Sequence, residues 1–313
     1  MEVAAYQHGI FPRSEAVVAA TRDLERGRAT ADNVVTAFVD DRAAYVRLQF
    51  ESGLDFHSDG LLRWADLFRP LVEATDGLTA DGLVRWFDNN SFYRAPHVDG
   101  PLAPTRPPEV FADLEDVTEP RVATLPSPYL FAKAVHGATD LSIELAESVL
   151  RPAAVTLRDR GCRVIHLEEP WIGFHGIQQS EWDSFEKAIG ALTDGLEVAT
   201  VLHVYYGDAS PHLDRLRRMP VTAVGVDLVE TDVDALGDRW ETGLLAGCIN
   251  GRTTFLEDAG AASTLVLRAA EITGAPSVFV SSNSELELLP LEAAKAKVHL
   301  LGEVAGRVKG GLV

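Results

Sequence analysis

Short apolar runs alternate with helical patterns along most of the chain, and this alternation constrains the fold more than any other feature. From Arg121 onward, strand-like runs recur at residues 122–125, 164–168, 197–205, 222–227, 244–249 and 277–280. Helical patterns lie between and after them, at residues 139–160, 179–193, 210–218, 231–241, 257–273 and 290–309. The runs are too apolar for half-exposed strands, which favours a parallel sheet covered by helices.

Two further units precede this region. Residues 3–8 are typical of a strand, and a helix capped by Ser14 follows. Thr30 begins a longer helix, after which residues 54–60 form a second strand with a polar end. The total of eight strand–helix units predicts an α/β fold of the TIM (β/α)8 barrel type, with residues 1–313 as a single domain. A doubly wound sheet is the alternative, but it gives no reason for eight matched units.

Residues 61–120 interrupt the pattern after the second predicted strand. Aromatic residues are scattered there among glycines and polar residues, and a proline-rich run follows. We expect an excursion made of a helix and a small hairpin, packed on one end of the barrel. Such a segment is either a satellite core, which is the commoner case, or a substrate lid.

Charge and composition exclude several classes of function. The chain has 28 basic and 47 acidic residues, and its net charge of −19 argues against nucleic acid or an anionic membrane as a partner. The two cysteines, Cys162 and Cys248, lie in apolar runs and are typical of core thiols in a reducing compartment. Neither a leader pattern nor a membrane-length apolar run is present, so a cytoplasmic protein with a small-molecule substrate is expected.

The run from Arg163 to Pro170 indicates where the chemistry lies. Strand alternation places Val164, His166 and Glu168 on one face, toward the barrel interior, and the apolar residues between them on the other. Active sites of such barrels lie at the carboxyl ends of the strands. The polar residues expected there are His8, Asp55, His57, Asp59, Ser127, His166, Glu168, Glu169, His203, Tyr205, Asp227, Asn250, Asn283 and Glu285. One strand-end histidine is most often structural, whereas several that converge indicate a functional site.

Read with their neighbours, several strand ends resemble the catalytic, C-terminal half of cobalamin-independent methionine synthase. The matching stretches are Gly9–Pro12, Gln49–Asp55, Leu125–Pro128, Ile165–Pro170, His203–Gly207 and Ser281–Leu286. The resemblance implies a TIM barrel with its site at the strand ends. It also implies a reaction in which zinc holds a homocysteine thiolate that accepts a methyl group from a folate.

The same resemblance shows departures at the implied zinc site. The family's histidine ligand corresponds to His203, but its two cysteines correspond to Tyr205 and Ser284, and its glutamate to Asp227. Hydroxyl groups bind zinc far less well than thiolates do. We therefore assign no metal ligands and expect no tightly bound zinc. Zinc remains possible only through a non-family ligand set, drawn from nitrogen and oxygen donors such as His57, His203, Asp227 and Glu168.

Two further departures concern groups that act on the substrate. The glutamate that faces homocysteine in the family corresponds to Leu61, and the proton-relay histidine corresponds to Arg252. Both changes remove groups that the implied reaction uses, which favours a different substrate.

The resulting hypothesis is a methionine-synthase-like enzyme that acts on a small molecule other than homocysteine. Glu168, His57, Asp59 and Asn283 are the expected substrate-binding residues, with Glu168 on a cationic or hydroxyl group. His203 and Tyr205 form the expected acid–base pair, and Asp227 is expected to orient His203. The alternatives are methyl transfer to a thiol, as in methionine synthesis, and a non-catalytic small-molecule binder. Fold alone does not separate these three.

Overall fold

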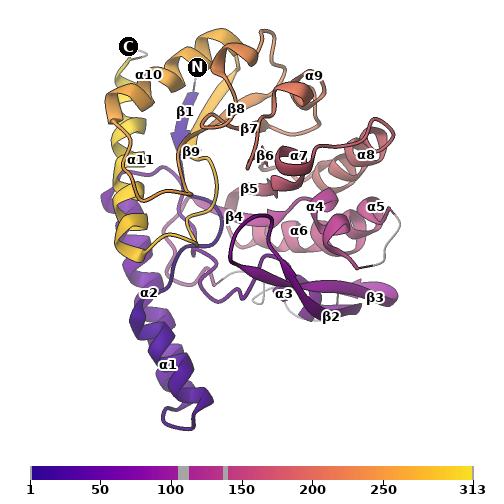
Figure 1. Cartoon of the computed structure of the whole chain (residues 1–313), viewed down its shortest axis with the longest axis vertical. Coiled ribbons are helices and arrows are strands. Elements are labelled where there is room, and N and C mark those ends of the chain that lie inside the picture. The colour runs from indigo at the N-terminus through magenta and orange to yellow at the C-terminus, as the bar shows by residue number, and fades with distance from the viewer. Residues whose placement is uncertain (1, 105–112, 137–139, 312–313) are drawn as a thin grey trace.

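The computed structural model of this chain describes residues 2–104, 113–136 and 140–311. Its centre is a curled, parallel, seven-stranded sheet in the order β1-β9-β8-β7-β6-β5-β4 (Figure 1). The strands are β1 (Glu2–Ala5), β4 (Arg121–Pro126), β5 (Cys162–Glu169), β6 (Ala199–Val204), β7 (Ala223–Asp227), β8 (Gly243–Ile249) and β9 (Ser277–Ser282). Chain order and spatial order agree around the sheet, as in a TIM barrel.

An extended segment at residues 55–57 joins the two edge strands. The Asp55 amide donates to the Ala5 carbonyl (2.8 Å), and the Asp55 carboxylate accepts from the Ala5 amide (2.7 Å). On the other side, His57 forms an isolated parallel bridge with Arg121 at the start of β4. The barrel predicted from the eight units is confirmed, and its second strand is reduced to this short connecting segment.

The interior of the barrel begins with an apolar layer. It comprises Tyr6, Val122, Val164, Val201, Ala223, Leu245 and Phe279. Ile165 and Leu167 point to the opposite side of β5 and join the larger core beneath the helices. The predicted alternation along this strand is therefore correct. His166 and Glu168 follow Val164 on the interior face, toward the carboxyl end of β5.

Helices surround the sheet, and most of them lie at the positions predicted from the sequence. They are α1 (Glu15–Glu25), α2 (Ala31–Glu51), α5 (Ser142–Leu145), α6 (Arg151–Asp159), α8 (Trp182–Thr193), α9 (Leu213–Leu216), α10 (Ala259–Thr273) and α11 (Leu291–Gly311). The helix expected at residues 231–241 is reduced to a 3-10 turn at Val233–Ala235. Gly237 and Arg239 take positive φ angles of 67° and 64°, which end any helix there.

Two short helices that the sequence patterns did not predict, α4 (Pro128–Ala134) and α7 (Pro170–His175), follow β4 and β5 directly. Each begins with proline, and the preceding Ser127 or Glu169 caps it by accepting a backbone amide hydrogen bond. Throughout the described ranges, no helix is both long and apolar enough to cross a bilayer.

The excursion contains a helix and a hairpin, as predicted. Helix α3 (Arg69–Glu73) leads into the antiparallel pair β2 (Thr75–Arg85) and β3 (Phe92–Pro104). Phe68 is fully buried, and its ring lies 5.9 Å from Trp86, 5.2 Å from Tyr93 and 5.4 Å from Phe131 of α4. One aromatic cluster thus joins the hairpin to a barrel helix.

That residues 1–313 fold as one domain stays a prediction, and Phe68 provides its test. Truncating Phe68 to alanine should lower the free energy of unfolding by about 3–5 kcal/mol, because it leaves a cavity where both parts meet. Urea unfolding followed by tryptophan fluorescence and far-UV circular dichroism should show one shared transition. Phe92→Ala is the control, since that ring is half exposed on the same hairpin. Two transitions, of which Phe68→Ala shifts only one, would contradict a single domain.

Candidate functional site

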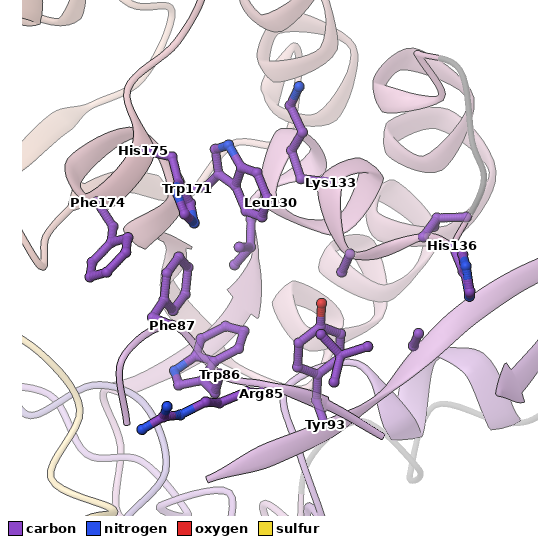
Figure 2. A pocket seen from close by; sticks show the side chains of 14 residues that line it. Arg85, Trp86, Phe87, Tyr93, Leu130, Lys133, His136, Trp171, Phe174 and His175 are labelled. Carbon is purple, nitrogen blue, oxygen red and sulfur yellow. The ribbon is translucent and has the colours of Figure 1, made fainter. Parts of the chain in front are cut away.

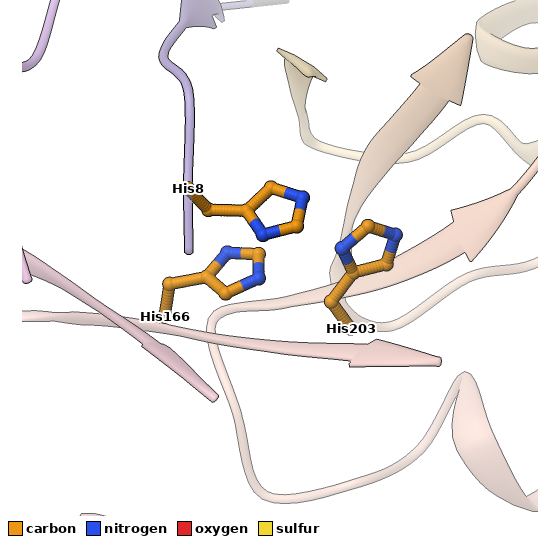
Figure 3. Close-up of side chains that lie close together, drawn as sticks. All are labelled: His8, His166 and His203. Carbon is orange, nitrogen blue, oxygen red and sulfur yellow. The ribbon is translucent and has the colours of Figure 1, made fainter. Parts of the chain in front are cut away.

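Three histidines come together inside the barrel above its apolar layer. His8 follows β1, His166 lies on β5 and His203 on β6, and all three are buried. The His8 and His166 rings are stacked, with centroids 4.1 Å apart, and the His203 ring stands perpendicular to His166 at 5.3 Å (Figure 3). One nitrogen from each ring lies within 4.8 Å of the others.

Only some of the hydrogen-bond donors and acceptors in this cluster have a partner. His8 Nδ1 donates to Glu168 Oε1 (2.7 Å), and His166 Nδ1 shares a hydrogen bond with the Tyr6 hydroxyl (2.9 Å). His166 Nε2, both nitrogens of His203 and Glu168 Oε2 are buried and have no hydrogen-bond partner among the described residues. A buried polar atom without a partner costs about 1–3 kcal/mol. Several that face one another indicate a place for a bound group.

Two glycines provide the space for His203. A Cβ atom added to Gly225 on β7 would lie 2.6 Å from His203 Cδ2, and one added to Gly247 on β8 would lie 3.3 Å from His203 Nε2. Real Cβ atoms do not approach other atoms as closely as the first of these distances. The ring therefore extends from β6 over the backbones of the next two strands.

Burial sets the charge states of the cluster. It lowers the pKa of His203, and the nearby His8 lowers it further. The pKa of His166 is lowered by burial and by both neighbouring histidines. Neutral imidazoles at the centre follow from these shifts, and a neutral imidazole can accept either a proton or a metal ion.

Carboxylates and a phenol surround the imidazoles. Burial raises the pKa of Glu285, and the charges of Glu287 and Glu168 raise it further. Burial also raises the pKa of Tyr205, followed by the charge of Glu168. Contact with Glu168 also raises the phenol pKa, although the Tyr205 hydroxyl forms no hydrogen bond of normal length to a described residue. Glu168 and Glu285 thus lie at the mouth of the barrel. Among the described residues, no basic side chain other than a histidine forms a hydrogen bond with either of them.

Asp227 and Asn283 form a separate, saturated pair. Asn283 Nδ2 donates to Asp227 Oδ1 (2.9 Å), and the same carboxylate accepts from the amides of Val229, Glu230 and Tyr206. Burial nevertheless raises the pKa of Asp227 to about 6. Tyr206 has a positive φ of 67°, so Asp227 stabilises a strained turn beside the site. Neither nitrogen of His203 donates a hydrogen bond to Asp227, so the expected orienting contact is not formed.

His57 and Asp59 lie apart from the histidine cluster. The His57 ring lies 6.3 Å from Phe50 of α2, whereas the neighbouring Phe56 packs against Tyr6 in the interior. Asp59 accepts hydrogen bonds from the Leu61 and Asp113 amides. None of these contacts links either residue with His203, Tyr205 or Glu168, so their role in substrate binding remains a prediction without structural support.

A cavity of about 440 Å³ lies beside the site, between the hairpin and helices α4 and α7 (Figure 2). Trp86 and Phe87 line it from the hairpin, Trp171 and Phe174 from α7, and Lys133 contributes a positive charge from α4. Rings in contact run from the cavity to the cluster: Phe87 to Tyr206 (5.6 Å), Tyr206 to Tyr205 (4.6 Å) and Tyr205 to His203 (5.2 Å). Two aromatic side chains, Tyr206 and Tyr205, therefore separate the cavity from His203.

The tip of the hairpin is fastened across the barrel mouth. The Arg252 guanidinium donates to both oxygens of Asp88, each at 2.7 Å, and lies over the Tyr206 ring at 5.0 Å. Asn89 also donates to the Tyr206 hydroxyl (3.4 Å). Arg252, which occupies the position of the implied proton relay, thus holds the hairpin in place. The excursion packs on the barrel as a satellite core and also lies where a lid would lie.

Sequence reasoning placed His8, His166 and Glu285 at strand ends but gave them no role, and it overlooked Tyr6. The useful signal was the two-residue spacing of Tyr6 with His8 and of His166 with Glu168. Each pair points to the same side of its segment, and the two segments meet inside the barrel.

Comparison with known proteins identifies related chains. The sequence model described as "Cobalamin-independent synthase, N-terminal domain" matches residues 73–274. Over 97% of this chain and 90% of its own length, a methionine synthase of Sulfolobus acidocaldarius is 28% identical. One from Methanothermobacter thermautotrophicus is 25% identical over 84% and 87%.

Structural comparison gives the same fold. A B12-independent methionine synthase of Shewanella sp. W3-18-1, solved with selenomethionine, superposes with a TM-score of 0.79 at 16% identity and covers 99% of this chain and 98% of that one. The matching sequence model describes an N-terminal domain, whereas the motifs that we compared belong to the C-terminal half. The archaeal relatives match across almost the whole chain.

The close packing of the His203 ring against Gly225 leads to a prediction. Gly225→Ala should destabilise the protein by about 1–3 kcal/mol, because the added methyl group overlaps the buried ring. Gly190→Ala is the matched control, since nothing lies within 4 Å of its added Cβ on α8. It should be neutral or stabilising by up to about 1 kcal/mol. Urea unfolding measures both variants, and equal stabilities would show that His203 does not occupy this position.

Proposed function

This chain belongs to the cobalamin-independent synthase family, and from this premise we propose that it is an enzyme acting on a small molecule other than homocysteine. Its site is the buried polar cluster at the carboxyl ends of β5 and β6. The observation that carries the proposal is the combination of a saturated Asp227 with unsatisfied His203 and Glu168. Of the residues at the family's zinc-ligand positions, Asp227 and Ser284 are engaged in hydrogen bonds, whereas His203 and Tyr205 are open to a ligand together with Glu168.

The family's zinc does not fit the corresponding residues of this chain. Within the described ranges, the Asp227 carboxylate accepts four hydrogen bonds, one from a side chain and three from backbone amides. The single Ser284 hydroxyl hydrogen is shared between Asn283 Oδ1 and the Glu285 carbonyl, at 3.3 and 3.4 Å. Tyr205 offers a phenol whose raised pKa keeps it protonated. These four positions together therefore do not provide the family's zinc site.

Recognition by charge follows from the acidic groups at the mouth. Glu168 has one free oxygen, and Glu285 lies against Gly9 on the same side. A primary amine satisfies such acceptors with hydrogen bonds to charged groups, the stronger class. His203 and Tyr205, whose rings are 5.2 Å apart, then lie where a neutral base and a protonated phenol exchange protons with the substrate.

The aromatic cavity is the second part of the proposed site. Its volume of about 440 Å³ is in the range of small-molecule pockets, and its walls are mostly aromatic with Lys133 at the edge. A planar group, from the substrate or from a second reactant, stacks favourably on such walls. Opening of the Asp88–Arg252 contact and movement of Tyr206 would connect the cavity with the histidines.

Methyl transfer to a thiol is the second candidate function. The archaeal methionine synthases that match almost the whole chain favour it. It requires a means to hold the thiol as thiolate, since free thiols of this kind are mostly protonated near neutral pH. A non-catalytic binder is the outcome if ligand binding occurs without turnover.

The experiment measures methionine formation from homocysteine and 5-methyltetrahydrofolate, with protein both freed of metal and supplied with zinc. We expect no turnover above a protein-free control. Turnover with zinc alone would establish the second candidate and contradict our proposal.

Ligand recognition is tested in parallel with a panel of amino acids and alkyl amines, by the rise in Tm. At least one amine should stabilise the protein. Glu168→Gln should weaken its binding by about 1–3 kcal/mol, since the charge-assisted contact is lost. His212→Gln, which changes a half-buried histidine with no assigned role, is the control and should bind normally. If no amine binds, or if Glu168→Gln binds as well as the unaltered protein, the proposed recognition is wrong.

A further inference from the structure

We propose that His8, His166 and His203 bind a divalent transition-metal ion, with zinc as the preferred ion. This site shares only His203 with the ligand set that the family resemblance implies. The inference deepens the proposed function and rests on it for any place in a reaction, because both use the same buried cluster; in the metal-bound state His203 is a ligand and no longer a free base. Metal binding itself is measured without substrate, so the two can fail separately.

The ligand atoms are those that face the centre of the cluster. His166 Nε2 and the nitrogens of His203 have no described partner, and His8 Nδ1 donates to Glu168. Figure 3 shows the stacked pair facing one nitrogen of His203. The proton between His8 and Glu168 lies where a metal cation would bind. Loss of this proton leaves one imidazole nitrogen and one carboxylate oxygen free to bind a cation. Metal binding releases such protons.

Supporting hydrogen bonds already orient two of the three rings. His8 Nε2 donates to the Ser282 carbonyl (3.3 Å), and His166 Nδ1 is hydrogen-bonded to Tyr6 (2.9 Å). Metal-binding histidines almost always use their second nitrogen in this way. His203 is positioned differently, because its ring packs over Gly225 of β7 and Gly247 of β8. His166 alone has one nitrogen supported and the other without a described partner, since both nitrogens of His8 are hydrogen-bonded and neither nitrogen of His203 is.

The donor set selects the ion. Three imidazoles suit zinc and related transition metals, whereas magnesium and calcium prefer oxygen ligands. Catalytic zinc sites commonly have three protein ligands and an open fourth position, here next to Glu168. Zinc–nitrogen bonds of about 2.1 Å place tetrahedral ligands about 3.4 Å apart, so atoms within 4.8 Å of one another must move together. The stacked His8 and His166 rings must also turn relative to one another, because each imidazole binds a metal in its own ring plane.

The test uses the full chain, freed of metal with a chelator and dialysed. Zinc is then titrated in competition with a chromophoric chelator, and bound zinc is measured by elemental analysis after gel filtration. We expect one zinc per chain. His8→Gln and His166→Gln should each weaken binding by more than the roughly 10–100-fold that loss of a supporting partner costs. Tyr6→Phe, which removes one such partner, should fall within that range.

Two control variants test whether zinc binds at these three histidines and at no other buried donor. His57→Gln removes a buried histidine whose two nitrogens also lack described partners. Asp227→Asn changes a residue of the implied family set. Both variants should retain zinc with unchanged affinity. Far-UV circular dichroism and urea midpoints establish that every variant compared is folded.

Cobalt substitution gives a readout that does not depend on any variant. Cobalt(II) bound to the unaltered protein should show the visible bands of a tetrahedral nitrogen and oxygen site. The near-ultraviolet charge-transfer band of a cobalt–thiolate bond should be absent. No stoichiometric metal on the folded protein, a thiolate band, or loss of zinc in Asp227→Asn but not in His8→Gln and His166→Gln would each overturn the proposal.

Discussion

The cost of burying imidazole and carboxylate groups inside a barrel determines how this protein is arranged around its site. The His8–Glu168 hydrogen bond, between two side chains without contact to solvent, satisfies part of that cost. Tyr6, from the apolar layer below, satisfies one nitrogen of His166. Gly225 and Gly247 leave room for His203 but offer it no partner. The polar atoms of the cluster that remain without a hydrogen-bond partner lie close together, where a ligand can supply the missing interactions.

The departures from the methionine synthase pattern form a consistent set. Positions where that family has thiolates carry Tyr205 and Ser284, and Asp227 is committed to backbone amides. Arg252 fastens the hairpin through Asp88 where the resemblance implies a proton relay. His8 and His166 supply nitrogen donors elsewhere in the same mouth. Apart from His203, the positions that the resemblance implies for zinc chemistry therefore carry other side chains in this chain.

Alternation and element count predicted much of the fold, because a parallel strand buried on both faces has a strict two-residue period. That period placed Val164, His166 and Glu168 correctly in the interior. It did not predict which strand ends meet, since that depends on the barrel's curvature and on glycines of neighbouring strands. His57 and Asp59 illustrate the difficulty: a polar end was visible in the sequence, but the segment turns His57 toward α2. Pairings such as Asp227 with Asn283 join residues 56 positions apart and leave no local pattern.

The central claim is that the three buried histidines form a ligand site and are not a structural part of the core. Anomalous diffraction at the zinc absorption edge, from crystals of the unaltered protein soaked in zinc, tests it most directly. The account predicts one strong peak inside the barrel, within bonding distance of His8, His166 and His203. A peak bonded to Asp227 or Ser284, or an interior without any peak in protein that remains folded, would contradict it.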